Sequence, residues 1–450
     1  MVPLASLQAD LMRNGTALID LDITQPLTQA TDVGQLSGET EVLCRLSDRP
    51  LGFVRAPVEH GRLAIDQALS EFLAHQANTC GVALAERTMA SGRPTRWPDA
   101  GALVRAVVPP ANSGPLVTVA VFPTGRFLHL RRCLDALMAL DYRPLDVLVV
   151  DTAPGSDIES MLRAEYPDVR YVRESRRGVS AGVERAIAEC RGDILAFTDD
   201  EAVVDRYWVS SIVRMFLADP EVMVVTGLVI PREVRSGRRL STDESRNVNA
   251  SWRRRWHRVS ADRRALVATA AGTPGTNIAF WRSVFDGSVN TEGTPDPTHT
   301  VIYEPSAIVR RGSWSAEPHT PVAVARADEW LNEFKPALRG RGSDARCRVD
   351  LGEPMRPIFD AVKHERVRVT VSWDGINLGE VGIEHHGAVV SAAWLTDVIA
   401  QDLTVPVLDA HTRLGETVLW ATVTSTLAHA LLPAIEASRR ERRRRLSEAA

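Results

Sequence analysis

Between Val117 and Phe197 the chain alternates short apolar runs with amphipathic segments. Leu130, Leu134 and Leu137 recur at helical spacing, whereas residues 147–150 form a continuous apolar run typical of a strand buried on both faces. This alternation predicts an α/β layer with a mostly parallel sheet. Right-handed crossovers place the loops after such strands along one edge, where ligands of open sheets bind.

Two segments that flank this region resemble each other. Leu51–Leu73 and Leu378–Ile399 align so that Gly52 matches Gly379, and both continue into a helix-like apolar pattern. We interpret them as two copies of a small module of two strands and a helix; chance similarity of two hairpins is the alternative.

Breaker residues between Pro109 and Pro115 indicate a linker before the central region. The expected organisation is an N-terminal accessory module over 1–108 with the first copy at 41–75, a linker over 109–116, an α/β domain over 117–315, a connector over 316–365, a C-terminal accessory module over 366–404 with the second copy, and a C-terminal helix and basic tail over 405–450.

Composition narrows the class of protein. The 450 residues are 44% hydrophobic and 24% charged, as in ordinary globular proteins, and 53 basic against 57 acidic residues give a net charge of -4. This balance provides no global attraction to nucleic acid, so we predict no nucleic-acid partner. Five scattered cysteines and a start without a secretory signal pattern predict a cytoplasmic location.

The most informative polar cluster is Asp199, Asp200 and Glu201, which follow the apolar run Ile194–Phe197 directly. Adjacent carboxylates repel one another and lose hydration, and a divalent cation with a phosphate partner needs such hard oxygen ligands. Acidic residues are also common as helix N-caps, and Asp205 is a candidate cap as well. The cluster alone leaves both interpretations open.

Five pieces of the central region occur in a characteristic order. They read VTVAVFPTGRFLHLRRCLDAL, DVLVVDTAPGSD, VRYVRESRRGVSAGVERAIAECRGDILAFTDDE, VTGLVIPREV and AAGTPGTNIAFWRSVF. Together they resemble the nucleotide-binding half of inverting family-two glycosyltransferases of the GT-A type. The resemblance implies a GT-A fold, a nucleoside diphosphate sugar donor linked to UDP, GDP or TDP, a hydroxyl acceptor, Mn²⁺ or Mg²⁺, and displacement with inversion at the anomeric carbon.

The resemblance also implies roles for individual residues. Donor contacts are expected from Thr124, Arg126, Asp151, Arg177, Gly178 and Asp199, metal ligation from Asp200 and Glu201, a loop beneath the sugar and acceptor from Gly275, Thr276 and Asn277, and a diphosphate contact from Arg310 and Arg311. The sequence departs from the family at Glu184, where an asparagine is frequent.

The largest departure concerns the general base. The family has a Glu-Asp pair before the segment that here reads YEP, but residues 286–303 contain no such pair. Three interpretations stay open: Glu292 or Asp296 serves as the base, the protein binds donor without transferring sugar as a degenerate binding or scaffold protein, or the segment has been deleted.

Two further segments carry basic and aromatic residues. Ser251–Ala265 contains two tryptophans, six arginines and a histidine, typical either of a surface for anionic headgroups and acceptor or of an amphipathic helix packed on the core. Thr417–Ile435 runs into a basic tail and is too polar for a convincing membrane span. Peripheral contact with the inner membrane face therefore stays open beside the cytoplasmic prediction.

Overall fold

A computed structural model describes residues 16–17, 19–22, 38–46, 48–59, 62–63, 82, 85, 89, 114–152, 157–234, 254–260, 277–286, 298–314, 344–359, 361, 364, 366–385 and 389–414. The chain divides into two compact units. The first comprises residues 1–15 and 109–336, and the second comprises residues 16–108 and 337–450.

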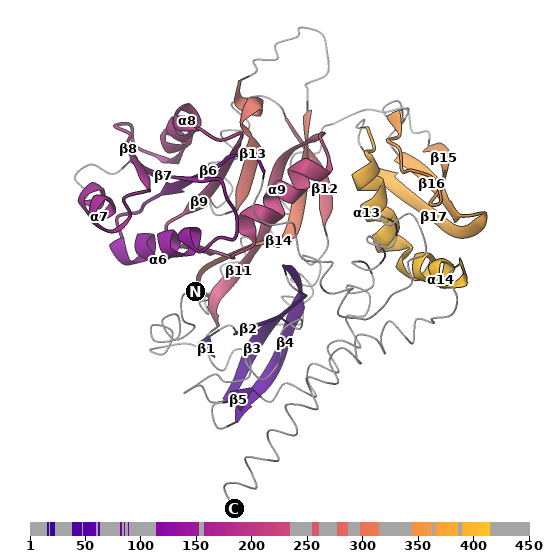
Figure 1. Ribbon diagram of the computed structural model, residues 1–450, viewed down its shortest axis with the longest axis horizontal. Helices are drawn as coiled ribbons and strands as arrows, with labels where there is room; N and C mark the ends of the chain where they lie inside the picture. Colours follow the sequence, from indigo (N-terminus) through magenta and orange to yellow (C-terminus); the bar gives the residue numbers. More distant parts are fainter. Residues whose placement is uncertain are drawn as a thin grey trace, which may run out of the picture. The chain divides into compact units, whose positions relative to one another are not determined.

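Strands and helices of the first unit alternate as the hydrophobic pattern predicts (Figure 1). The elements are β6 (Val117–Phe122), α6 (Phe127–Met138), β7 (Leu145–Asp151), α7 (Ile158–Glu165), β8 (Arg170–Arg173), α8 (Val179–Glu189), β9 (Ile194–Asp199), β10 (Ala202–Val204), α9 (Trp208–Ala218), β11 (Val222–Val234), β12 (Arg255–Ser260), β13 (Ile278–Trp281), the 3-10 helix η1 (Arg282–Phe285) and β14 (Thr298–Trp314).

The strands form a curled sheet in the order β10-β14-β11-β13-β9-β6-β7-β8, with β12 also paired to β14. β8, β7, β6 and β9 are parallel, and β13 is antiparallel to both β9 and β11. β11 and β14 are parallel to each other and therefore to β9. The predicted α/β class is confirmed, and the carboxyl ends of six strands share one edge.

Apolar residues from both faces of this sheet are buried. α6, α7 and α9 cover one face, where Leu130, Leu134 and Leu137 are fully buried as their helical spacing predicts. α8 and η1 cover the other face, where Val183 packs with residues of β7 and β9. This sandwich of helices around a sheet makes the shared edge a rigid support for the loops that follow the strands.

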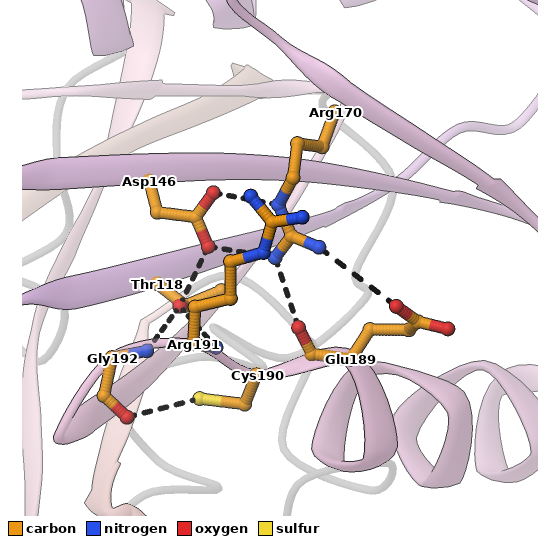
Figure 2. Close-up of polar contacts among 7 residues, drawn as sticks. All are labelled: Thr118, Asp146, Arg170, Glu189, Cys190, Arg191 and Gly192. Atoms are coloured by element: carbon orange, nitrogen blue, oxygen red, sulfur yellow. Dashed lines mark hydrogen bonds and ion pairs between the residues drawn. The ribbon is translucent and has the colours of Figure 1, made fainter.

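A polar network closes the opposite edge, where β6, β7 and β8 begin (Figure 2). Arg170 donates two hydrogen bonds of 2.7 Å to the two carboxylate oxygens of Asp146, and Thr118 Oγ1 donates to Asp146 Oδ2 at 2.8 Å. Arg170 also donates to the Glu189 carbonyl at 2.9 Å, and the Gly192 N–H donates to Thr118 Oγ1 at 2.9 Å. The network ties three strands to the end of α8.

The second unit contains two small sheets, of four and three strands, in which three strands have the same order and directions. In the first, β2 (Ile19–Asp22) is parallel to β3 (Gly38–Leu46), which is antiparallel to β4 (Arg49–Glu59). In the second, β15 (Asp344–Asp350) is parallel to β16 (Arg366–Trp373), which is antiparallel to β17 (Ile376–Glu384). The unit also contains β1 (Thr16–Ala17), β5 (Arg62–Leu63), α13 (Ala392–Asp402) and α14 (Thr404–Leu414).

Gly52 and Gly379 occupy equivalent places in these sheets. Gly52 has φ +145° and lies opposite Cys44 beside a register shift, and Gly379 has φ +135° and lies opposite Val371 beside another. A bulge at this point requires a backbone conformation that glycine adopts readily. β15 lies in the segment predicted as a connector, and α13 follows the second hairpin. The helix-like pattern of the first copy lies outside the described residues.

Candidate functional site

The acidic cluster lies at the carboxyl edge of the central sheet. Asp199 ends β9, and Asp200 and Glu201 form the turn that leads into β10. β6 lies beside β9, with Phe122 opposite Asp199, so the loop after β6 meets this turn (Figure 1). Residues more than 70 positions apart in the sequence are thereby brought together.

Asp200 is held by the loop after β6. Asp200 is 1% exposed, and its Oδ2 accepts hydrogen bonds from the Thr124 N–H at 2.7 Å and from Thr124 Oγ1 at 3.0 Å. Its Oδ1 is buried and has no hydrogen-bond partner among the described residues. Burial raises the pKa of Asp200, the charge of Glu201 adds to this, and the bonds from Thr124 oppose it.

Glu201 faces two basic side chains at the start of α6. Its Oε1 lies 3.4 Å from Arg126 Nη1 and 3.8 Å from His129 Nδ1. Between Thr124 and Arg126, Gly125 has φ +89°, a left-handed conformation that costs other residues free energy. This tight turn directs the residues on both of its sides toward the acidic turn.

A second residue of α6 also touches the acidic turn. Cys133, one helical turn beyond His129, donates its thiol to the Asp199 carbonyl at 3.4 Å. Burial raises the pKa of the Cys133 thiol well above its usual range, and the charges of Asp199 and Asp200 add to the rise. The thiol is therefore a neutral packing group at neutral pH, not a nucleophile.

The donor set of the acidic turn fits a divalent cation carried by a phosphate. Asp200 Oδ1 is a buried carboxylate oxygen without a hydrogen-bond partner in the described part of the chain, and Glu201 supplies a second carboxylate beside it. Within that part, no group of three or more metal-ligating side chains gathers. Mg²⁺ is commonly bound by one or two carboxylates together with substrate phosphates, which matches this arrangement.

The other expected donor residues lie along the same edge, at the end of β7 and before α8. Asp151 is fully buried and accepts a hydrogen bond of 2.9 Å from the Tyr171 hydroxyl. Burial and the bond to Asp151 raise the pKa of Tyr171 to about 12. Arg177 is exposed, and Gly178 is the N-cap of α8. Tyr171 was not singled out by the sequence, because only the paired strands show that it faces Asp151.

Arg176, the residue before Arg177, is held in place by two ion pairs. Arg176 bridges Glu174 at 3.1 Å and Glu184 at 2.8 Å. Glu184 stands where the family frequently has asparagine. In this chain its carboxylate accepts a hydrogen bond from Arg176, which lies in the turn before α8. The exposed Arg177 is thus the arginine of this pair that can turn toward a ligand.

Asn277 ties three elements together beneath the expected sugar loop. Its residue is 2% exposed; its Nδ2 donates to the carbonyls of Leu228 at 3.1 Å and Ala307 at 2.7 Å, and its Oδ1 accepts from Trp208 Nε1 at 2.8 Å. The side chain therefore supports the sheet. Gly275 and Thr276, the preceding residues of that loop, lie outside the described residues.

Arg310 and Arg311 lie on β14 beside the strand that leaves the acidic turn. They pair in register with Val203 and Ala202 of β10. The candidate bases Glu292 and Asp296 lie outside the described residues.

The segment Ser251–Ala265 contains a strand, so the interpretation as an amphipathic helix is wrong for residues 255–260. β12 pairs with β14, and Trp256 packs against the core. Just before it, Arg254 donates to Glu304 at 2.7 Å. Burial would raise the pKa of Glu304, but the charges of Arg254 and Arg214 lower it to about 2.

Comparison with known proteins identifies the central domain. Residues 125–287 match the family model Glycosyl transferase family 2. The chain is 22% identical over 230 residues to a glucosyl-dolichyl phosphate glucuronosyltransferase of Haloferax volcanii, covering 49% of this chain and 70% of that protein.

Two solved structures are also similar. A mannosyltransferase of Pyrobaculum calidifontis in complex with GDP-Man and Mn²⁺ is 17% identical with a TM-score of 0.36, covering 82% of this chain and 97% of that chain. GalNAc-T7 with UDP, GalNAc and Mn²⁺ is 14% identical with a TM-score of 0.31, covering 49% and 48%. Among the described residues, no helix is long and apolar enough to cross a membrane. The match over residues 125–287 confirms the predicted resemblance of the central region to the family 2 glycosyltransferases and the predicted GT-A fold class.

Proposed function

We propose that the protein transfers a sugar from a nucleoside diphosphate donor to a hydroxyl acceptor with inversion, using Mn²⁺ or Mg²⁺. The observation that carries this proposal is the buried Oδ1 of Asp200 at the carboxyl edge, which has no hydrogen-bond partner among the described residues, with Glu201 beside it. A divalent cation on these carboxylates would neutralise the charge that develops on the leaving diphosphate.

Other residues along the carboxyl edge bind the remaining parts of the donor. Asp151, oriented by Tyr171, accepts a hydrogen bond from the base, and Arg177 with the N-terminus of α8 closes the nucleotide pocket. Asp199 binds the ribose. Arg126, which contacts Glu201, and Arg310 and Arg311, which lie on β14 beside β10, supply positive charge for the diphosphate.

A general base must remove the proton of the attacking hydroxyl, and its pKa must lie near the working pH. Glu304 does not meet this requirement, because Arg254 and Arg214 hold its pKa near 2 and its residue is 1% exposed. Glu292 and Asp296 therefore stay the candidate bases.

Titration calorimetry with UDP, GDP and TDP, each with and without Mn²⁺, tests the proposed donor site. We expect one nucleotide to bind in a Mn²⁺-dependent way, and Asp200→Asn to weaken that binding about 10- to 100-fold. Asp286→Asn is the matched control, because this exposed aspartate lies beyond η1 at the opposite end of the sheet. Equal losses in both variants would contradict a specific role for Asp200.

Donor turnover then separates a transferase from a degenerate binder. The donors for this assay are UDP- and GDP-sugars, with UDP-glucuronate included because the relative in Haloferax is named a glucuronosyltransferase. We expect slow donor hydrolysis without acceptor, and its loss in Glu292→Gln or Asp296→Asn identifies the base. Base-selective binding without any turnover would support a sugar-nucleotide-binding protein instead.

A further inference from the structure

Thr124 contacts Asp200 in a way that leaves one carboxylate oxygen available. Both polar groups of Thr124, the backbone N–H and the hydroxyl, donate to the same atom, Asp200 Oδ2. The two bonds fix the plane of the carboxylate about its last torsion, because a partial rotation would move the accepting oxygen away from both donors. Oδ1 is thereby held in one position.

The other carboxylate oxygen of Asp200 has no hydrogen-bond partner in the part of the chain that the structure describes, which is costly without a ligand. Asp200 Oδ1 is buried, and a buried polar atom without a partner loses its hydration without compensation. A buried carboxylate oxygen of this kind calls for a specific explanation, and an ion is one of the few. Thr124 itself is exposed, so its contact with Asp200 is not a consequence of core packing.

We propose that Thr124 is a positioning residue that holds Asp200 so that Oδ1 faces the divalent cation. This inference rests on the proposed function, since it assigns Thr124 to the cation site through Asp200 and not to direct contact with the nucleotide. The tight turn at Gly125 allows this, because it brings Thr124 to Asp200 while Arg126 faces Glu201. The neighbouring Arg126 competes with the cation for Glu201, whereas Thr124 orients Asp200 toward the cation.

The test is Mn²⁺ binding followed by electron paramagnetic resonance, with Mn²⁺ alone and with Mn²⁺ plus UDP or GDP. Thr124→Val keeps the shape and the backbone N–H but removes the hydroxyl, and we expect Mn²⁺ affinity to fall about tenfold. Thr124→Ser retains the hydroxyl and is expected to bind within about twofold of the wild type.

Thr118→Val is the matched control, because it removes a threonine hydroxyl bonded to an aspartate at the other end of the same strand. We expect it to lower the unfolding temperature without changing Mn²⁺ affinity. Asp200→Asn tests the metal site itself, separately from the role of Thr124. If Asp200→Asn binds Mn²⁺ like the wild type, the proposed metal site is wrong and this inference with it.

If Asp200→Asn loses Mn²⁺ but Thr124→Val does not, the metal site stands and the role of Thr124 is overturned. A loss of Mn²⁺ in Thr118→Val equal to that in Thr124→Val would also overturn it, since both would then act through general destabilisation.

Discussion

Replacing Asp146 with asparagine is expected to lower the free energy of unfolding by about 3 kcal/mol, the lower end of the range for breaking a buried ion pair. The side chains of Asp146 and Arg170 are 13% and 16% exposed, and their two parallel hydrogen bonds leave little room for water. Arg170 retains the Glu189 carbonyl in the variant, so we expect the lower end of the range (Figure 2).

The pH dependence of this loss distinguishes charge from packing. Burial would raise the pKa of Asp146, but the hydrogen bonds and charge of Arg170 lower it below its ordinary value. A depressed pKa in the folded state stabilises the protein above the unfolded pKa of about 4, and this contribution disappears as pH falls through the folded value. The difference between wild type and Asp146→Asn should therefore shrink below about pH 4.

Urea unfolding at pH 7 and pH 3 measures this difference. Glu165→Gln is the control, because the Arg131–Glu165 pair joins α6 to α7 with both side chains largely exposed and should contribute much less. Since Asp146 lies at the start of β7, at the edge of the sheet opposite the carboxyl edge, we expect nucleotide binding by the folded variant to be unchanged. An Asp146→Asn variant as stable as the wild type at pH 7 would show that the pair gives no net stabilisation.

Local periodicity was sufficient to predict the central α/β domain. The helical spacing of Leu130, Leu134 and Leu137 and the apolar run at 147–150 reflect burial within single elements, which short sequence windows record. The position of Asp199 at a strand end follows from the same pattern. Ser251–Ala265 misled because arginine and tryptophan fit either period, and pairing with a strand some 45 residues away decided between them.

The partners of the site residues could not be predicted from the sequence. Thr124 was expected beside the nucleotide, but its contact with Asp200 depends on β6 and β9 being neighbours in the sheet. Glu201 was expected as a metal ligand, and its ion pair with Arg126 depends on the turn at Gly125. Motif resemblance assigns residues to a site, whereas the order of the strands determines which of them hold one another.

The partners of Asn277 could not be predicted from the sequence either. Replacing Asn277 with alanine is expected to lower the free energy of unfolding by about 3 kcal/mol or more. The change would leave three buried groups without their partner: the Trp208 indole N–H and the carbonyls of Leu228 and Ala307. Each buried group left unpaired costs about 1–3 kcal/mol. The packing around Asn277 is also tight, because a side chain at Gly227 would clash with Asn277 and Ala307.

Two variants separate hydrogen bonding from packing at Asn277. Asn277→Asp keeps the volume and the acceptor for Trp208, but it sets a carboxylate oxygen against two carbonyls, so we expect it to be at least as destabilised as Asn277→Ala at pH 7. Ser211→Ala is the control on α9, because the buried Ser211 hydroxyl has no hydrogen-bond partner in the described residues and its removal should cost little. Thermal and urea unfolding provide the comparison. A stable Asn277→Asp would return Asn277 to the role that the resemblance implies, a contact for sugar or acceptor, because the three hydrogen bonds would then carry no net stabilisation.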